Sequence, residues 1–311
     1  MNIAVVFPGQ GSQAVGMLTD YAADWPIVKQ TFEQASDALG YDLWDIVANG
    51  PEDKLNQTEI TQPAMLAADM AIGRILSEQC MLKPFVLAGH SLGEYAALVG
   101  ADAIDFTDAI RLVSLRGKLM QQAVPAGEGA MAAIIGLADL QIIEACEQTT
   151  EQTGKPAEAV NFNSPGQVVI AGATEAVEKA IELCKQAGAK RAMPLPVSVP
   201  SHSSLMKPAA DKLAEALKDV DIKSPQIDVL HNVDAKSHSN PDDIRDALAK
   251  QLYNPVRWVQ TVEIIADSAD AIVECGPGKV LTGLAKRIAK EAPSYSLSTQ
   301  AGMDKFLEST V

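Results

Sequence analysis

The segment Gly89-His90-Ser91-Leu92-Gly93 constrains the fold of this chain more than any other. It follows an apolar run at 85–88, typical of a buried strand, and it opens a stretch of helical periodicity at 92–100. A G-x-S-x-G segment between a strand and a helix predicts a sharp turn that exposes the serine hydroxyl and needs glycines where a Cβ would clash. Ser91 is therefore a candidate nucleophile. The alternative is a glycine-rich turn that only ends a buried strand.

Short apolar runs alternate with longer helical stretches along the chain, which predicts an α/β fold. The strands expected outside the central region are 4–7, 85–88, 227–230 and 271–274. The helices expected there are 62–79, 92–100, 107–123, 204–218, 242–252, 256–266 and 278–290.

The central region has a different order of elements. We expect strands at 130–135, 157–162, 168–171 and 191–195, with helices at 139–149 and 175–187. This βαββαβ order is typical of ferredoxin-like units, and Pro-rich segments flank it. The sequence therefore predicts a subdomain at 126–196 inserted into a catalytic domain made of 1–125 and 197–311. A ligand is expected in the cleft between the two.

Composition excludes several classes of protein. A net charge of −15 argues against a nucleic-acid partner, which requires clustered Lys and Arg. No apolar run reaches the roughly 18 residues of a membrane span, and no leader is expected before the first strand. The four cysteines have neither disulfide-like nor zinc-like spacing, so we expect reduced thiols, a cytoplasmic location and no metal or other cofactor.

A serine nucleophile needs a base, and the chain has four histidines. His202 follows directly on the proline-flanked return from the subdomain, at the expected mouth of the cleft, and is the candidate base. A structural histidine is the alternative. His90 adjoins the serine and is interpreted as a packing or positioning residue. His238 lies in a polar turn and is expected to be solvated, whereas His231 ends a strand and is a second residue that could lie near the site.

An acid to orient the histidine is missing from the expected place. In α/β-hydrolases the acid lies between serine and histidine in the chain. Asp102, Asp105, Asp108 and Asp139 occupy that interval, but they stand at helix starts or turns, where capping explains them. We therefore predict a serine–histidine dyad whose histidine is oriented by a carbonyl or an amide, which fixes its tautomer.

Two further features fit a site around Ser91. The loop Gly9-Gln10-Gly11 after the first strand lacks the lysine of a P-loop and the third glycine of a dinucleotide fingerprint. Its Gln10 N–H is a candidate oxyanion donor beside the N–H of Leu92 at the helix start, although a plain tight turn is the alternative. Arg116 would be solvated on an ordinary helix, but facing the cleft its planar fork would hold a carboxylate by two hydrogen bonds.

Eight segments together resemble one enzyme family. They are Phe-Pro-Gly-Gln-Gly-Ser-Gln (7–13), Thr-Gln-Pro-Ala (61–64), Gly-His-Ser-Leu-Gly-Glu-Tyr (89–95), Arg-Gly-Lys-Leu-Met (116–120), Asn-Phe-Asn-Ser-Pro-Gly-Gln (161–167), Val-Pro-Ser-His (199–202), Gln-Leu-Tyr-Asn-Pro-Val (251–256) and Glu-Cys-Gly-Pro-Gly-Lys-Val-Leu (274–281). In this order they resemble the malonyl-CoA:acyl carrier protein transacylases of bacterial type II fatty acid synthesis. The resemblance spans essentially the whole chain and implies a hydrolase-like parallel-sheet core with a ferredoxin-like insertion.

The resemblance implies a ping-pong acyl transfer with malonyl-CoA and acyl carrier protein as partners. Ser91 would take the malonyl group as an ester, and the phosphopantetheine thiol of the carrier would remove it, with His202 as base in both steps. The main competing hypothesis is a serine hydrolase or thioesterase of the α/β-hydrolase type, which the turn around Ser91 does not exclude. A catalytically inactive carrier-binding module is disfavoured because every matched catalytic position is filled.

The resemblance also implies a role for each matched position. The oxyanion would be held by the backbone N–H groups of Gln10 and Leu92, and the malonyl carboxylate by Arg116. The main-chain carbonyl of Gln251 would orient His202. The acyl pocket would be lined by Gln62, His90 and Met120.

Overall fold

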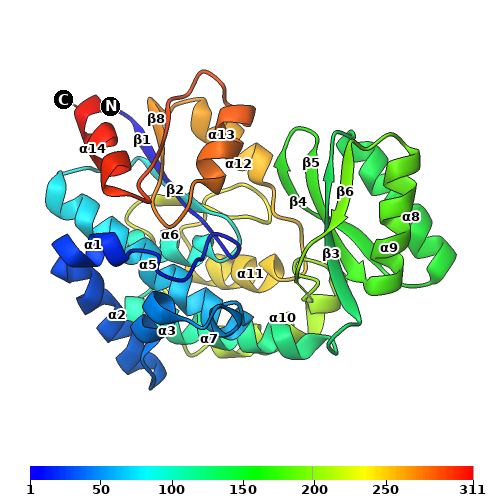
Figure 1. Ribbon diagram of the computed structural model, residues 1–311, viewed down its shortest axis with the longest axis horizontal. Helices are drawn as coiled ribbons and strands as arrows, with labels where there is room; N and C mark the ends of the chain where they lie inside the picture. Colours follow the sequence, from blue (N-terminus) through cyan, green and yellow to red (C-terminus); the bar gives the residue numbers. More distant parts are fainter. Residues whose placement is uncertain (198, 311) are drawn as a thin grey trace.

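The computed structural model describes residues 1–197 and 199–310 and contains two sheets (Figure 1). One is a five-stranded parallel sheet in the order β7-β2-β1-β8-β9, and the other is a four-stranded antiparallel sheet in the order β4-β5-β3-β6. The first consists of β1 (Ile3–Phe7), β2 (Val86–Gly89), β7 (Asp228–Leu230), β8 (Ala271–Glu274) and β9 (Ser294–Ser296). The α/β fold class is confirmed.

Helices cover both faces of the parallel sheet. All five residues of β1 are buried, as expected for a strand covered on both sides. Ile3, Val5 and Phe7 belong to the core formed with α5, α6 and α7, whereas Ala4 and Val6 belong to the core formed with α12 and α13. The helices outside the insertion are α1 (Thr19–Asp24), α2 (Pro26–Leu39), α3 (Leu43–Asn49), α4 (Glu52–Leu55), α5 (Thr58–Gln79), α6 (Gly93–Gly100), α7 (Phe106–Ala123), α10 (Lys207–Leu217), α11 (Pro241–Gln251), α12 (Trp258–Ala266), α13 (Val280–Ile288) and α14 (Gln300–Ser309), with a 3-10 turn at Ser204–Met206.

The strand register places two loops side by side. Phe7 at the end of β1 pairs with Gly89 at the end of β2. The loop at 8–11 and the turn that carries Ser91 therefore leave the sheet at the same edge. This is the carboxyl edge, where open parallel sheets bind their ligands.

The antiparallel sheet has the predicted ferredoxin-like arrangement and lies at the right of Figure 1. Its elements are β3 (Gly129–Ile135), α8 (Asp139–Thr153), β4 (Ala157–Ser164), β5 (Gln167–Ala173), α9 (Thr174–Gln186) and β6 (Arg191–Pro194). The two helices pack on one face around a core of their own. At the edge formed by β4, the N–H of Val256 in the larger unit donates to the carbonyl of Val160 at 2.8 Å. The domain bounds at 125/126 and 196/197 stay a prediction.

Several element boundaries differ from the prediction. The helix expected at 62–79 begins at Thr58 and carries Pro63 inside it, although proline usually marks a first turn. Burial of the first turn and a hydrogen bond from Thr61 Oγ1 to the Leu55 carbonyl accompany the early start. The helix expected from 256 begins at Trp258, because Val256 instead bridges to Asn161 of β4. Helices α1–α4 and α14 and strand β9 were not predicted.

Within the described part of the chain, no helix combines the length and apolarity that a membrane span requires.

Candidate active site

Ser91 lies on the sharp turn between β2 and α6, with a positive φ of 52°. A Cβ at Gly89 would lie 1.8 Å from the carbonyl carbon of Gly93, and one at Gly93 would lie 2.1 Å from the Phe7 carbonyl oxygen. Both glycines are therefore required by close backbone approach, which is the reason that the sequence suggested. The strained turn projects the Ser91 hydroxyl above the edge of the sheet.

We expect Gly89→Ala to lower the free energy of unfolding by about 3 kcal/mol, the upper end of the usual cost of overpacking, because the clashing atoms are backbone and cannot rotate away. Urea denaturation monitored by circular dichroism measures this loss. The control is Gly283→Ala in α13, where a Cβ meets nothing within 4 Å. Alanine there should raise stability by roughly 0.5–1 kcal/mol through helix propensity. Equal stabilities for the two variants would contradict the close-approach argument.

The structure brings Ser91 and His202 together. Ser91 Oγ lies 2.8 Å from His202 Nε2, and His202 Nδ1 lies 2.7 Å from the main-chain oxygen of Gln251. A carbonyl oxygen only accepts, so Nδ1 carries the hydrogen and Nε2 is left to accept the serine proton. The orienting group is thus a neutral carbonyl, so none of the acids between Ser91 and His202 in the sequence is needed to orient the histidine.

His202 is held in its neutral form. Burial, followed by the nearby charge of Arg116, lowers the pKa of His202 from 6.5 to about 3, although the hydrogen bond to the Gln251 carbonyl opposes this shift. Above this pKa the imidazole is uncharged, so it is available as a proton acceptor at neutral pH.

Arg116 is buried in α7 and points at the nucleophile. Its guanidinium donates to the side-chain oxygens of Gln62 and Gln251, both at 2.8 Å, and to Ser91 Oγ at 3.2 Å. All three acceptors are neutral, and the Nε–H has no partner among the described residues. Of the two interpretations left open by the sequence, the solvated helix face is wrong. A buried cation with neutral partners favours binding of an anion beside Ser91.

Two backbone N–H groups face this region without partners. The N–H of Ser91 donates to Asn232 Oδ1 at 2.7 Å and that of Gly93 to the His90 carbonyl at 3.0 Å. Between them, the N–H of Leu92 makes no hydrogen bond within residues 1–197 and 199–310, and neither does the N–H of Gln10. The adjacent ends of β1 and β2 thus bring two free donors to the side of the serine.

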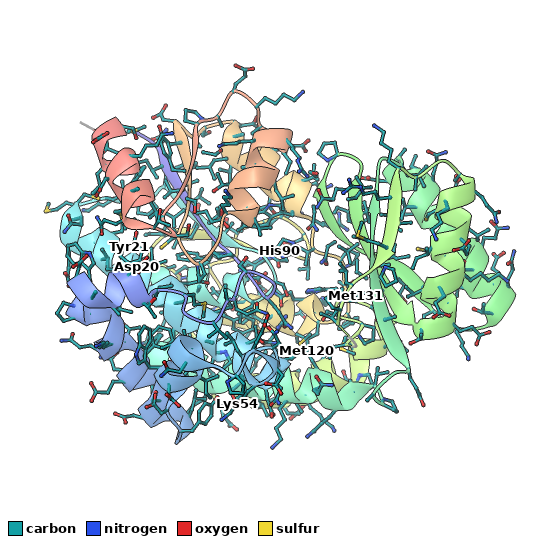
Figure 2. All side chains as sticks on the ribbon, in the orientation of Figure 1. Asp20, Tyr21, Lys54, His90, Met120 and Met131 are labelled. Atoms are coloured by element: carbon teal, nitrogen blue, oxygen red, sulfur yellow. The ribbon has the colours of Figure 1, made fainter. Side chains whose placement is uncertain are left out.

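A cavity of about 590 Å³ opens over the serine, between the parallel sheet and the inserted unit. Figure 2 shows His90 and Met120 on one side of this junction and Met131 of β3 on the other. His90 Nε2 lies 2.8 Å from Asn163 Oδ1, so this histidine connects the serine turn to the inserted unit. The described lining includes His90 and Met120 but not Gln62, which lies between Met120 and Arg116.

The sequence did not single out Asn232 or Glu94. Asn232 holds the serine turn from both sides, since its Oδ1 accepts from Ser91 N–H and its Nδ2 donates to the Gly89 carbonyl at 2.7 Å. Asn232 follows β7, which pairs with β2. A polar residue just after a parallel strand lies at the ligand-binding edge of the sheet, so this position could have identified Asn232 from the sequence. His231, the second histidine considered, lies one residue earlier, and its Nδ1 lies 2.7 Å from Glu94 Oε1. His238 is half-buried against Asp234 instead of fully solvated.

Comparisons with known proteins agree with one another. The family described as acyl transferase domain matches residues 4–306. The chain is 60% identical over 305 residues to a malonyl CoA-acyl carrier protein transacylase of Haemophilus influenzae, covering 97% of each. It is similar to the crystal structure of an acyl carrier protein S-malonyltransferase from Vibrio cholerae, with a TM-score of 0.95, 57% identity and coverage of 98% and 100%. It is also similar to a malonyl-transacylase solved in complex with its type II PKS acyl-carrier protein, with a TM-score of 0.97, 55% identity and coverage of 99% and 100%.

Proposed function

The chain belongs to the acyl transferase family, and from this we propose that it moves a malonyl group from coenzyme A to the phosphopantetheine thiol of an acyl carrier protein through an ester on Ser91. The choice of a carboxylated acyl group rests on the buried Arg116. Its partners among the described residues are all neutral, and one of them is Ser91 Oγ at 3.2 Å.

In the first half-reaction His202 Nε2 takes the hydroxyl proton while Ser91 Oγ attacks the thioester carbonyl. The free N–H groups of Gln10 and Leu92 stabilise the oxyanion of the tetrahedral intermediate. The C–S bond then breaks, and the departing coenzyme A sulfur takes the proton from His202. What remains is a malonyl ester on Ser91.

The second half-reaction repeats these steps with a new thiol. The carrier thiol gives its proton to His202, and its sulfur attacks the ester carbonyl. The C–O bond to Ser91 breaks and the hydroxyl recovers the proton from His202. Throughout, the Gln251 carbonyl keeps the hydrogen on Nδ1 and the ring in place.

A serine hydrolase would use the same dyad, so the two activities differ in the fate of the ester. With the malonyl carboxylate held by Arg116, the acyl group would lie beside Ser91 in the cavity that Gln10, Leu92 and His202 also line. A thiol on a long flexible arm that fills the rest of this cavity would reach the ester and displace the water that hydrolysis requires.

The intact mass of the protein after mixing with malonyl-CoA tests this proposal. We expect a single malonyl adduct on a peptide that contains Ser91, lost within seconds when a pantetheinylated acyl carrier protein is added and retained far longer in buffer. Rapid loss in buffer would instead identify a hydrolase, and no adduct at all would reject the ester on Ser91.

The low pKa of His202 predicts an unusual pH profile. The base is neutral above its pKa, so acylation of Ser91 should lose rate only as the pH falls toward about 3. Single-turnover acetylation by p-nitrophenyl acetate, an ester without an ionisable group, should therefore be nearly constant between pH 5 and 8. In Arg116→Ala the loss of rate at low pH should begin at a higher pH, because Arg116 is one of the groups that lower the pKa of His202. An inflection near 6.5 in the wild type would contradict this prediction.

A further inference from the structure

One buried carboxylate at the site has no part in the proposed reaction. Glu94 lies in the first turn of α6 and is fully buried. Its Oε1 lies 2.7 Å from His231 Nδ1, and its Oε2 accepts from the N–H of Asn232 at 2.8 Å and from Gln251 Nε2 at 2.9 Å. A carboxylate is retained in a core only where such partners offset its desolvation. All three partners belong to segments that also contact or adjoin the serine turn.

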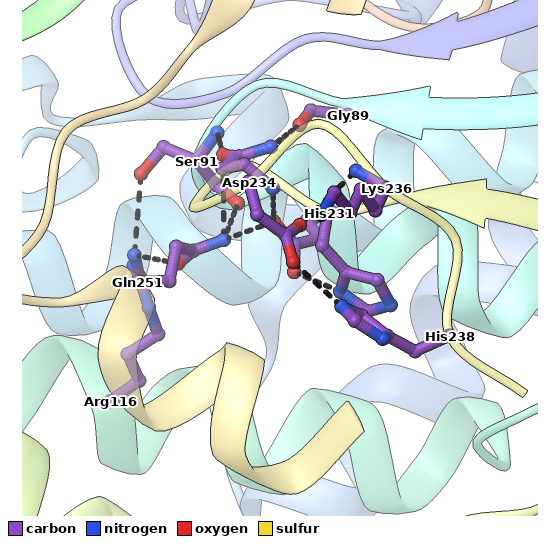
Figure 3. A network of polar contacts seen from close by, with 10 residues as sticks. Gly89, Ser91, Arg116, His231, Asp234, Lys236, His238 and Gln251 are labelled. Atoms are coloured by element: carbon purple, nitrogen blue, oxygen red, sulfur yellow. Dashed lines mark hydrogen bonds and ion pairs between the residues drawn. The ribbon is translucent and has the colours of Figure 1, made fainter. Parts of the chain in front are cut away.

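The side chain of Gln251 lies between this carboxylate and Arg116. Its Oε1 accepts from the guanidinium of Arg116 at 2.8 Å (Figure 3), while its Nε2 donates to Glu94 Oε2 at 2.9 Å. A guanidinium only donates and a carboxylate only accepts, so the two charges fix which end of the amide faces which. Glu94 and Arg116 are thus two opposite buried charges joined through one polarised amide.

This indirect pairing differs in consequence from a direct ion pair. A carboxylate bonded directly to Arg116 would occupy the same fork that a substrate carboxylate needs. With the amide between them, the guanidinium keeps an opposite charge nearby while its Nη2 still reaches Ser91 Oγ at 3.2 Å. Burial lowers the pKa of Arg116, and Tyr95 and Glu94 are among the groups that oppose this lowering.

The same glutamine serves the dyad. Its main-chain oxygen accepts from His202 Nδ1, and its Nε2 also donates to the Ser91 carbonyl at 2.9 Å. Whatever fixes Gln251 therefore fixes the relative positions of the base, the nucleophile and the cation.

We propose that Glu94 is a positioning residue that acts through Gln251 to keep Arg116 aimed at Ser91 and open to an incoming carboxylate. It thereby makes the preference for carboxylated acyl groups depend on a charge that never touches the substrate. This inference rests on the proposed function, because it assumes that Arg116 receives the acyl carboxylate. The competing explanation is that Glu94 only joins α6 to the loop after β7.

The readout that separates these explanations is acyl selectivity. A loss of structure lowers acylation by every substrate, whereas a displaced Arg116 affects only substrates that carry a carboxylate. Single-turnover acylation of Ser91 by malonyl-CoA and by acetyl-CoA, followed by intact mass, gives the ratio of the two rates. In Glu94→Gln, which keeps the shape and removes the charge, we expect this ratio to fall at least tenfold, mainly through weaker binding of malonyl-CoA. In Glu94→Asp, which keeps the charge, part of the ratio should be restored.

Glu274 supplies the matched control. It is equally buried, and its carboxylate accepts from the N–H groups of Leu281 and Thr282 and from the Thr282 hydroxyl, away from the described cavity lining. Glu274→Gln should cost stability but change the ratio less than twofold. In an Arg116→Ala background, Glu94→Gln should leave the ratio unchanged, because the group that it positions is gone.

Several outcomes would overturn the inference. An equal fall with both substrates in Glu94→Gln, an unchanged ratio, or the same change in Glu274→Gln would each leave Glu94 with a structural role only. If Glu94→Gln does not fold, Glu94→Asp is the deciding variant. Because its side chain is shorter, we expect the malonyl-to-acetyl ratio to fall at least threefold. An unchanged ratio in Glu94→Asp would overturn the proposal. A failure of the proposed function would be seen separately, in the wild-type protein. Either no malonyl adduct would form on it, or the adduct would be lost rapidly to water.

Discussion

Replacement of Ser91 by alanine is expected to abolish the malonyl adduct and to lower malonyl transfer by at least roughly 10⁴-fold, as for other enzymes that lose the nucleophile of a catalytic unit. The physical reason is that Ser91 Oγ is the atom that His202 Nε2 contacts at 2.8 Å and toward which Arg116 points. Without it the base has no hydroxyl to deprotonate. Intact mass after incubation with malonyl-CoA and a carrier-malonylation assay measure the two effects.

Ser201 is the matched control for this change. It also lines the cavity, and within residues 1–197 and 199–310 its hydroxyl donates only to the Val199 carbonyl, at 3.4 Å. Ser201→Ala should form the adduct and pass it to the carrier. Persistent labelling of Ser91→Ala, or loss of labelling in both variants, would remove Ser91 from its proposed role.

Arg116→Ala is expected to lower kcat/KM for malonyl-CoA by about 30- to 1000-fold and to leave acetyl-CoA much less affected. Loss of one partner of a buried, charge-assisted contact typically costs about 2–4 kcal/mol, and each 1.4 kcal/mol is a factor of ten. The kcat/KM of Arg116→Lys for malonyl-CoA should lie between those of the wild type and Arg116→Ala. Lysine keeps the charge but lacks the planar guanidinium that binds a carboxylate through two hydrogen bonds. Steady-state kinetics with both coenzyme A esters give the selectivity.

The control for this second prediction lies on the same helix. Arg111 is exposed and pairs with Asp108 at 3.3 Å, a surface contact worth little. Arg111→Ala should keep both the activity and the preference for malonyl-CoA. If Arg116→Ala showed the same malonyl-to-acetyl ratio as the wild type, the cation would not be the group that recognises the acyl carboxylate.

The sequence predicted some parts of this protein and not others. Alternation of apolar runs and helical stretches predicted the α/β class and the order of the inserted strands and helices, because both patterns report local backbone geometry. The glycines around Ser91 were predicted for the same reason, since each is required by contacts within one tight turn and the strand beside it.

The burial of Arg116 could not be predicted from the local sequence pattern. On its own helix it could face water or the interior. It is buried because α7 packs closely on α5, where a Cβ at Gly117 would lie 2.6 Å from the Thr58 carbonyl, and this approach brings Arg116 beside Gln62. Gln62 was singled out only through the family resemblance, and its contact with the Arg116 guanidinium results from the packing of the two helices.

What the sequence by itself determined was the strand–turn–helix unit with Ser91, the inserted unit and His202 as the candidate base. Tertiary structure alone decided which groups surround them: Asn232 on the serine turn, and Glu94 linked through the Gln251 side chain to Arg116. The reason is that these residues come from four separate segments, brought together by the register of parallel strands and by helix packing. A periodicity within one segment carries no information on such contacts, because their partners lie more than a hundred residues away in the chain.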